Sequence, residues 1–152
     1  MPATTTTHLK RTYKRITGDG SRREAGEPEY YVLGGGSVGQ SMAERLRALG
    51  HSVTVVDEDH VVGDLPGKQG DPEDLRVLQA AGVSDTSTVV VATDQDGRNL
   101  LIAQLVRAHF DVPEVLVLVN DPDRRGLVAR AGHEPVCATT ALADALVEKV
   151  DR

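Results

Sequence analysis

A run of glycines between an apolar segment and an amphipathic one limits most strongly what this chain can fold into. The pattern G-x-G-x-x-G is met by Gly34-Gly35-Gly36-Ser37-Val38-Gly39. The motif follows the apolar stretch 29–33, which we expect to be a strand. It opens the segment 37–49, where apolar residues recur at helical spacing, namely at Val38, Met42, Leu46 and Leu49. A strand, a glycine turn and a helix in this order are typical of the first unit of a dinucleotide-binding fold.

Each glycine of the motif has its own expected use. Gly34 allows a tight turn, Gly36 lets the backbone approach a phosphate, and Gly39 lets the helix pack closely on the sheet. The first backbone N–H groups of the helix, at Ser37 and Val38, attract negative charge. The motif therefore predicts a phosphate-binding turn, and a glycine-rich turn without a ligand is the alternative.

Short apolar segments alternate with amphipathic ones along the rest of the chain. We expect strands at 29–33, 53–56, 65–69, 88–92, 115–119 and 134–138. We expect helices at 37–49, 72–81, 96–109, 122–131 and 139–150. Asp71 would cap the second helix, and Thr139 or Thr140 the last.

This order of elements predicts the α/β class, with a Rossmann-like doubly wound parallel sheet. Continuous apolar strands such as 115–119 are expected to be buried on both faces. The stretch 58–69 is an exception, because it is interrupted by Pro66 and has too little apolar periodicity for a long helix. We expect a loop there, with the short strand 65–69 at its end.

Length and charge bound the organisation of the chain. Its 152 residues suit a single domain, placed at 29–152. Residues 1–28 hold six basic and three acidic residues and predict a flexible basic tail. The net charge of −6 therefore leaves −9 on the remainder, which argues against a nucleic-acid-binding surface. No apolar run approaches the ~20 residues of a membrane span, and the polar N-terminus is unlike a secretory signal, so we expect a cytoplasmic protein without membrane insertion.

Asp57 is expected to bind a ribose. It ends the second strand, 18 residues after Gly39, where a carboxylate can accept both hydroxyls of an adenosine ribose. The same carboxylate would repel a 2′-phosphate. Its sequence neighbours Glu58 and Asp59 include no Arg that could bind one, so NADP is disfavoured.

Three more polar residues follow later strands, at the edge of the sheet where doubly wound folds bind ligands. Thr93 and Asp94 are expected on the phosphate or second-nucleoside side. Asp71 is either a ligand-site residue or only a helix cap. Asn99 is expected to be an ordinary polar residue in the first turn of its helix.

No catalytic constellation stands out, so we expect neither an enzyme nor a metal site. The histidines form no close motif and are expected at the surface; they are His8, His51, His60, His109 and His133. An acidic loop explains the group Asp57, Asp59, His60 and Asp64 better than a metal cluster does. The single Cys137 excludes a disulfide framework and a Cys-based zinc site, and is interpreted as a core residue.

Six sequence blocks resemble those of one known family, in the same order and spacing. They are GGGSVG, VTVVD, GDPEDLRVLQAAGV, VVVATDQDGRNLLIAQLVR, VPEVLVLVNDP and ATTALADAL. Over residues 29–147 the chain is similar to the nucleotide-binding N-terminal domain of regulators of K+ conductance, the TrkA-N or RCK domain. Two departures are the short 58–69 segment, where the family usually has a helix, and Leu118, where it often has an Arg.

The resemblance implies a ligand and partners. The family domain binds NAD(H), ATP or ADP, regulates potassium channels and transporters, and commonly forms dimers. By this similarity Gly34, Gly36 and Gly39 hold phosphate, Asp57 holds ribose, and Asp71 and Thr93 lie beside the ligand. The final helix, 139–150, would be an interface. Because the sequence holds no pore segment, the chain is expected to act on a separate membrane protein, at the inner face of the membrane.

The expected function is therefore a nucleotide-binding regulatory subunit of a potassium transport system that works through a ligand-dependent conformational change. NAD is the first expected ligand, with ADP or ATP as the alternative. Two other functions stay open: a Rossmann scaffold that binds no nucleotide, and a small NAD-dependent oxidoreductase.

Overall fold

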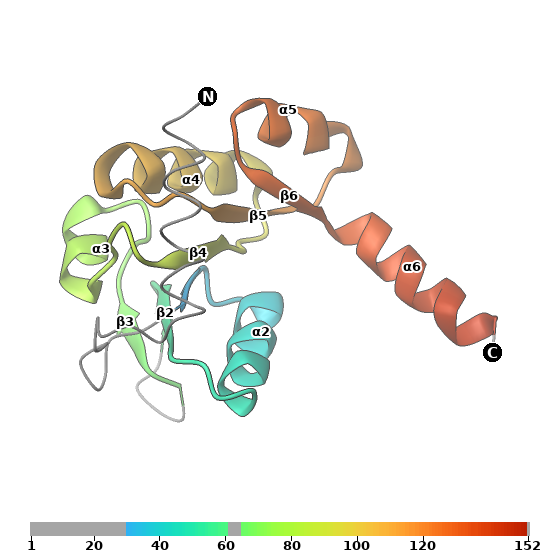
Figure 1. Ribbon diagram of the computed structural model, residues 1–152, viewed down its shortest axis with the longest axis horizontal. Helices are drawn as coiled ribbons and strands as arrows, with labels where there is room; N and C mark the ends of the chain where they lie inside the picture. Colours follow the sequence, from blue (N-terminus) through green and yellow to red (C-terminus); the bar gives the residue numbers. More distant parts are fainter. Residues whose placement is uncertain (1–29, 61–64, 152) are drawn as a thin grey trace, which may run out of the picture.

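The computed structural model describes residues 30–60 and 65–151. Six parallel strands form one sheet in the order β3-β2-β1-β4-β5-β6 (Figure 1). The strands are β1 Tyr30–Leu33, β2 Val53–Asp57, β3 Gly67–Gln69, β4 Thr88–Val91, β5 Val115–Val119 and β6 Glu134–Cys137. The helices are α2 Ser37–Ala48, α3 Leu75–Ala81, α4 Asp96–Phe110, η1 Pro122–Arg124, α5 Arg125–Arg130 and α6 Ala138–Val150. The predicted doubly wound fold is confirmed; the predicted tail, 1–28, lies outside the described residues.

Two apolar clusters hold the helices to the sheet. The larger joins alternate strand residues to α3, α4 and α5 through side chains that include Leu33, Val91, Leu78, Val106 and Val128. The smaller lies on the opposite face, under α2, and consists of Val32, Ala43, Val53 and Val55. Because successive side chains of β1 point to opposite faces of the sheet, Tyr31 and Leu33 join the larger cluster and Val32 joins the smaller one.

The expectation that 115–119 is buried on both faces is wrong. Val115, Val117 and Val119 are buried, but Leu116 and Leu118 are only half-buried. The larger cluster covers the first set, whereas α2 covers β1 and β2 and does not reach β5. An apolar strip of sheet therefore stays open, and it continues onto Val136 of β6, the register partner of Leu118.

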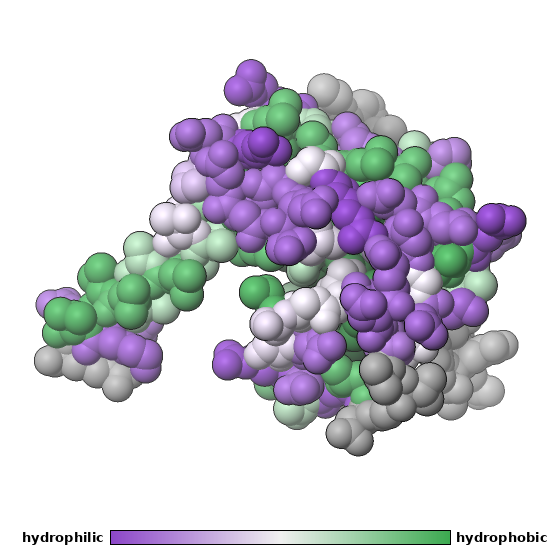
Figure 2. All heavy atoms as spheres, turned by 180° about the vertical axis from the view of Figure 1, so that it is seen from behind, coloured by the Kyte–Doolittle hydropathy of each residue, from purple (hydrophilic) through white to green (hydrophobic). Residues whose placement is uncertain are grey.

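The last helix projects away from the body (Figure 1). Residues 139–150 of α6 are all exposed, and its apolar side chains are green along the projecting arm in Figure 2. Four large apolar residues are at least three-fifths exposed: Leu142, Leu146, Val147 and Val150. This helix contributes nothing to either cluster.

Three expected element boundaries are wrong. Helix α3 begins at Leu75 and not at Pro72; its cap is Asp74, whose carboxylate accepts from Arg76 N at 2.9 Å. The carboxylate of Asp71 instead accepts from Glu73 N at 2.8 Å, which closes a turn that competes with helix formation. The expected helix 122–131 is divided into η1 and α5. The last helix begins after Cys137, without a side-chain cap from Thr139 or Thr140.

The inner face of α2 also differs from the expectation. Its buried residues are Gly39 and Ala43, while Val38 and Leu49 are exposed. The reason is the close approach of this helix to the sheet at Gly39, where a side chain has no room; Leu46, further along the helix, is half-buried and packs against the smaller cluster, as expected.

Two histidines expected at the surface are buried. His60 lies against the backbone of Gly67 on β3. His133 is 5% exposed, and its Nε2 lies 3.2 Å from Gln104 Oε1 on α4. Its Nδ1 has no hydrogen-bond partner within the part of the chain that is described. Burial, together with the charge of nearby Arg107, lowers the pKa of His133.

This lowered pKa predicts a pH dependence of stability. Since the folded pKa lies below the unfolded value of 6.5, the stabilisation is present above pH 6.5 and is lost as the pH falls below it. Urea unfolding at pH 7.5 and pH 5.5 measures the loss. His133→Phe should reduce the difference between the two pH values, whereas His109→Phe, at an exposed position, should leave it unchanged. An unchanged difference in His133→Phe would contradict the prediction.

Candidate functional site

The glycine turn leads from β1 directly into α2. Gly34 has φ of 104°, a conformation that favours glycine. A Cβ on Gly39 would lie 2.1 Å from the carbonyl oxygen of Gly34, so only glycine lets the helix approach this closely. At Gly36 a Cβ would meet no atom within 4 Å. The turn and packing roles predicted for Gly34 and Gly39 agree with this geometry, and Gly36 borders open space.

The N-terminus of α2 opens onto the same space. Gly36 is its N-cap residue, and no side chain caps the helix. Ser37 and Val38 are exposed, and because they are the first two residues of the helix, their backbone N–H groups have no partner within it. The donor set therefore suits the phosphate of an adenylate.

Asp57 lies beside the turn. A Cβ on Gly35 would be 2.9 Å from Asp57 Cγ, so the carboxylate packs against the glycine backbone. One carboxylate oxygen, Oδ2, accepts a hydrogen bond from Asp59 N at 3.1 Å. The side chain is half-buried. The structure thus brings together the turn predicted to bind phosphate and the carboxylate predicted to bind ribose.

Asp71 belongs to an ion-pair cluster at the same edge of the sheet. Arg98 of α4 donates from Nη2 to Glu58 and to Asp71 (3.0 Å), and from Nε to Glu73 (3.0 Å). Burial by itself lowers the pKa of Arg98, but its hydrogen bonds to Glu58 and Asp71 outweigh this and raise it above the ordinary value. The cluster ties the segments after β2 and β3 to the first turn of α4.

Thr93, which follows β4, packs against the glycine turn on the side opposite Asp57, and so borders the crevice at the carboxyl ends of the strands. It is buried, and its Cγ2 would be 2.8 Å from a Cβ on Gly34. Asn99 holds it: Asn99 Oδ1 accepts from Thr93 N at 3.0 Å, and Asn99 Nδ2 donates to Thr93 O and Leu118 O, both at 3.0 Å. Asn99 is fully buried, so its interpretation as an ordinary polar residue is wrong. Asp94, next to Thr93, is exposed.

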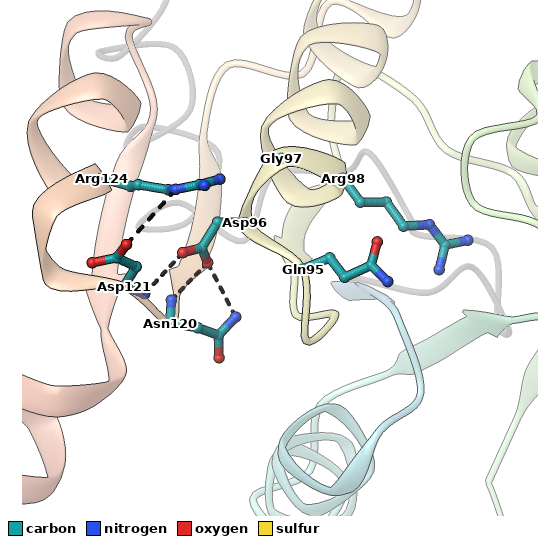
Figure 3. A pocket seen from close by; sticks show the side chains of 7 residues that line it. All are labelled: Gln95, Asp96, Gly97, Arg98, Asn120, Asp121 and Arg124. Carbon is teal, nitrogen blue, oxygen red and sulfur yellow. Dashed lines mark hydrogen bonds and ion pairs between the residues drawn. The ribbon is translucent and has the colours of Figure 1, made fainter.

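An open pocket of about 560 Å³ adjoins Thr93, between the first turn of α4 and the segment after β5 (Figure 3). It is lined by Gln95, Asp96, Gly97, Arg98, Asn120, Asp121 and Arg124. Asp96 accepts from the backbone N–H groups of Asn120 (2.7 Å) and Asp121 (2.8 Å). Burial raises the pKa of Asp96, but these hydrogen bonds outweigh it and hold the pKa below its ordinary value.

Sequence reasoning missed Arg98, Asn99 and Asp96. All three lie in the first turn of α4, in the segment Asp96-Gly97-Arg98-Asn99, where a cluster of polar residues after a buried strand is itself a usable signal.

Within the described ranges, no group of three or more His, Cys, Asp or Glu residues is arranged to hold a metal ion; Asp64 lies outside these ranges. None of the described helices is both long and apolar enough to cross a bilayer.

Comparison with known proteins agrees with the predicted resemblance. The TrkA-N domain model matches residues 30–139. The Trk system potassium uptake protein TrkA of Mycobacterium tuberculosis is 30% identical over 125 residues, which make up 78% of this chain and 57% of that protein. The chain spans a little over half the length of this protein and of the similar TrkA proteins of Methanothermobacter thermautotrophicus and Streptomyces coelicolor.

Solved structures share the fold. The Kef CTD of Shewanella denitrificans, solved in an AMP-bound form, gives a TM-score of 0.71 at 24% identity, over 80% of this chain and 78% of that chain. GsuK bound to ADP also gives 0.71, at 20% identity, over 91% of this chain and 37% of that chain. The GsuK channel bound to NAD gives 0.63 at 18% identity, over 84% of this chain and 25% of that one.

The glycine geometry predicts opposite outcomes for two matched substitutions. Gly39→Ala should destabilise the fold by about 2–3 kcal/mol, because the clash with the Gly34 carbonyl outweighs the better helix propensity of Ala. Gly36→Ala should change stability by less than about 1 kcal/mol, since its Cβ meets open space. Thermal unfolding of both variants measures the difference, and equal losses would contradict this account of the turn.

Proposed function

Since the chain belongs to the TrkA-N family, we propose that it binds an adenine nucleotide and regulates a potassium transport system as a non-enzymatic subunit. The observation that carries the proposal is the uncapped N-terminus of α2, open at Gly36, with the carboxylate of Asp57 beside the glycine turn. The α2 amides bind the phosphate, and Asp57 accepts the ribose hydroxyls. When bound, the nucleotide supplies only its charge and shape and undergoes no chemical step.

The pocket beside Thr93 supports a dinucleotide as the ligand. It lies at the carboxyl end of β4 and β5, across the strand-order reversal from Asp57, where the second half of a dinucleotide lies in doubly wound folds. NAD therefore fills the crevice on both sides of the turn, whereas ADP or ATP uses only the α2 and Asp57 side. The relatives' names support potassium transport as the regulated process.

The proposed mechanism is a population shift between arrangements of a homo-oligomer. The exposed apolar residues of α6 and the open strip at Leu116, Leu118 and Val136 are surfaces of the kind that a second copy covers. A nucleotide that binds one arrangement more tightly shifts the population toward it. We propose that this change is passed to a separate potassium channel or transporter, at the cytoplasmic face of the membrane.

Removing the phosphate and ribose contacts should abolish nucleotide binding without unfolding the protein. Gly36→Asp places a carboxylate at the N-cap, where it caps α2 and repels phosphate, and Asp57→Ala removes the ribose acceptor. Calorimetric titration with NADH, ADP and ATP should show saturable binding by the wild type and at least about 100-fold weaker binding by Gly36→Asp. Asp85→Ala, at an exposed site, is the control. A wild-type protein that binds none of the three nucleotides would contradict the proposal.

Charges on the apolar side of α6 should dissociate the oligomer. Leu142 and Leu146 are 65% and 63% exposed and lie one turn apart. We expect Leu142→Glu/Leu146→Glu to shift the mass measured by light scattering at micromolar concentration from oligomer to monomer. Ala141→Glu, on the other side of the helix, is the matched control. A monomeric wild-type mass in high salt would overturn this part of the proposal.

A further inference from the structure

Arg98 lies at the edge of the proposed ribose site, although it is forty residues from Glu58 in the sequence. The backbone oxygen of Asp57 accepts the N–H of Gly70 at 3.0 Å, which joins the ends of β2 and β3. The next residue on each segment is Glu58 or Asp71, and Arg98 Nη2 bonds to both of these. The guanidinium therefore bridges the two residues directly beyond the Asp57–Gly70 pair.

Three carboxylates surround this one cation. Glu73 accepts a hydrogen bond from Arg98 Nε at 3.0 Å, and Glu58 and Asp71 both accept from Arg98 Nη2. The Arg98 side chain is only 25% exposed, whereas that of Glu58 is 50% exposed. The guanidinium is a planar donor well suited to phosphate, but here it is already bonded to carboxylates. Their three negative charges exceed its single positive charge, so the cluster has a formal net charge of −2. Without these partners, the Arg98 guanidinium would attract a 2′-phosphate.

We propose that Glu58 is a specificity-determining residue that acts through Arg98: it keeps the guanidinium from pairing with a 2′-phosphate, so that the site rejects 2′-phosphorylated adenine nucleotides. The proposal rests on nucleotide binding at Gly36 and Asp57. The charge of Asp57 is one cause of the rejection of a 2′-phosphate. The pairing of Glu58 with Arg98 of α4 is a second cause.

Of the three carboxylates around Arg98, Glu58 is the one whose replacement disturbs the rest of the structure least. It is the most exposed of the three carboxylates, and it follows β2 without capping a helix or closing the turn that Asp71 closes. Replacing it with Gln removes one negative charge and leaves Arg98 anchored by Asp71 and Glu73. Asp57, which binds the ribose hydroxyls, is unchanged.

Two ligand pairs that differ only in the 2′-phosphate provide the test: NADH with NADPH, and ADP with 2′-phospho-ADP. Calorimetry on the full chain should show that the wild type prefers the unphosphorylated member of each pair. Glu58→Gln should reduce that preference about tenfold, mainly through tighter binding of the phosphorylated member. Adding Arg98→Met should abolish the gain, because the two residues are coupled.

Glu134→Gln, on β6 at the opposite edge of the sheet, is the matched control and should leave the preference unchanged. Thermal unfolding of each variant verifies that it is folded. If Glu58→Gln/Arg98→Met does not fold, Glu58→Gln/Arg98→Lys replaces it, and its gain should be smaller because Lys lacks the planar pair of donors.

The outcomes separate the two proposals. A wild type that binds neither member of either pair overturns nucleotide binding, and this inference with it. A wild type that binds NADH and NADPH equally overturns only the inference. The same holds if the gain in Glu58→Gln persists without Arg98, because the effect would then come from the lost charge of Glu58 alone and would not act through Arg98.

Discussion

The contact between α2 and the end of β1 fixes the position of everything at the proposed site. A Cβ on Gly39 would lie 2.1 Å from the Gly34 carbonyl oxygen, so the helix approaches the strand as closely as two backbones allow. This approach directs the first N–H groups of α2 toward the space in front of Gly36, and packs Gly35 against Asp57. A small displacement of the helix would separate the amides from the carboxylate and so remove the combination that suits an adenylate.

Polar contacts, and not helix packing, hold the other walls of the crevice. Between β2 and β3 no helix is seen among the described residues, and His60 packs on Gly67 instead. Arg98 joins the segments after these strands to α4, Asn99 binds Thr93 and Leu118, and Asp96 binds the backbone after β5. Three residues of one helical turn thus tie the carboxyl ends of four strands together. Because each contact is directional, the network fixes geometry as well as adding stability.

The sequence predicted the doubly wound sheet because its strands are separate aliphatic runs and its glycines fall between a strand and a helix. It predicted less well where local signals compete. Asp71-Pro72 looks like a helix start, yet Asp71 closes a turn and Asp74 is the cap. In α2 the spacing of Val38, Met42, Leu46 and Leu49 suggested the inner face. Leu46 does pack against the smaller cluster, but the buried residues are Gly39 and Ala43, and Val38 and Leu49 are exposed. Periodicity records which residues share a side, and not how near the neighbouring backbone lies.

The order of the elements, the turn at Gly34–Gly39 and the carboxylate at Asp57 follow from the sequence alone, because each depends on residues adjacent in the chain. Only the tertiary structure decided which side chains from distant segments meet at the carboxyl ends of the strands. Arg98 reaches Glu58, Asn99 is fully buried, the strip at Leu116 and Leu118 stays open, and α6 leaves the body. These features depend on distances between segments tens of residues apart, which hydrophobic pattern and local propensity do not encode.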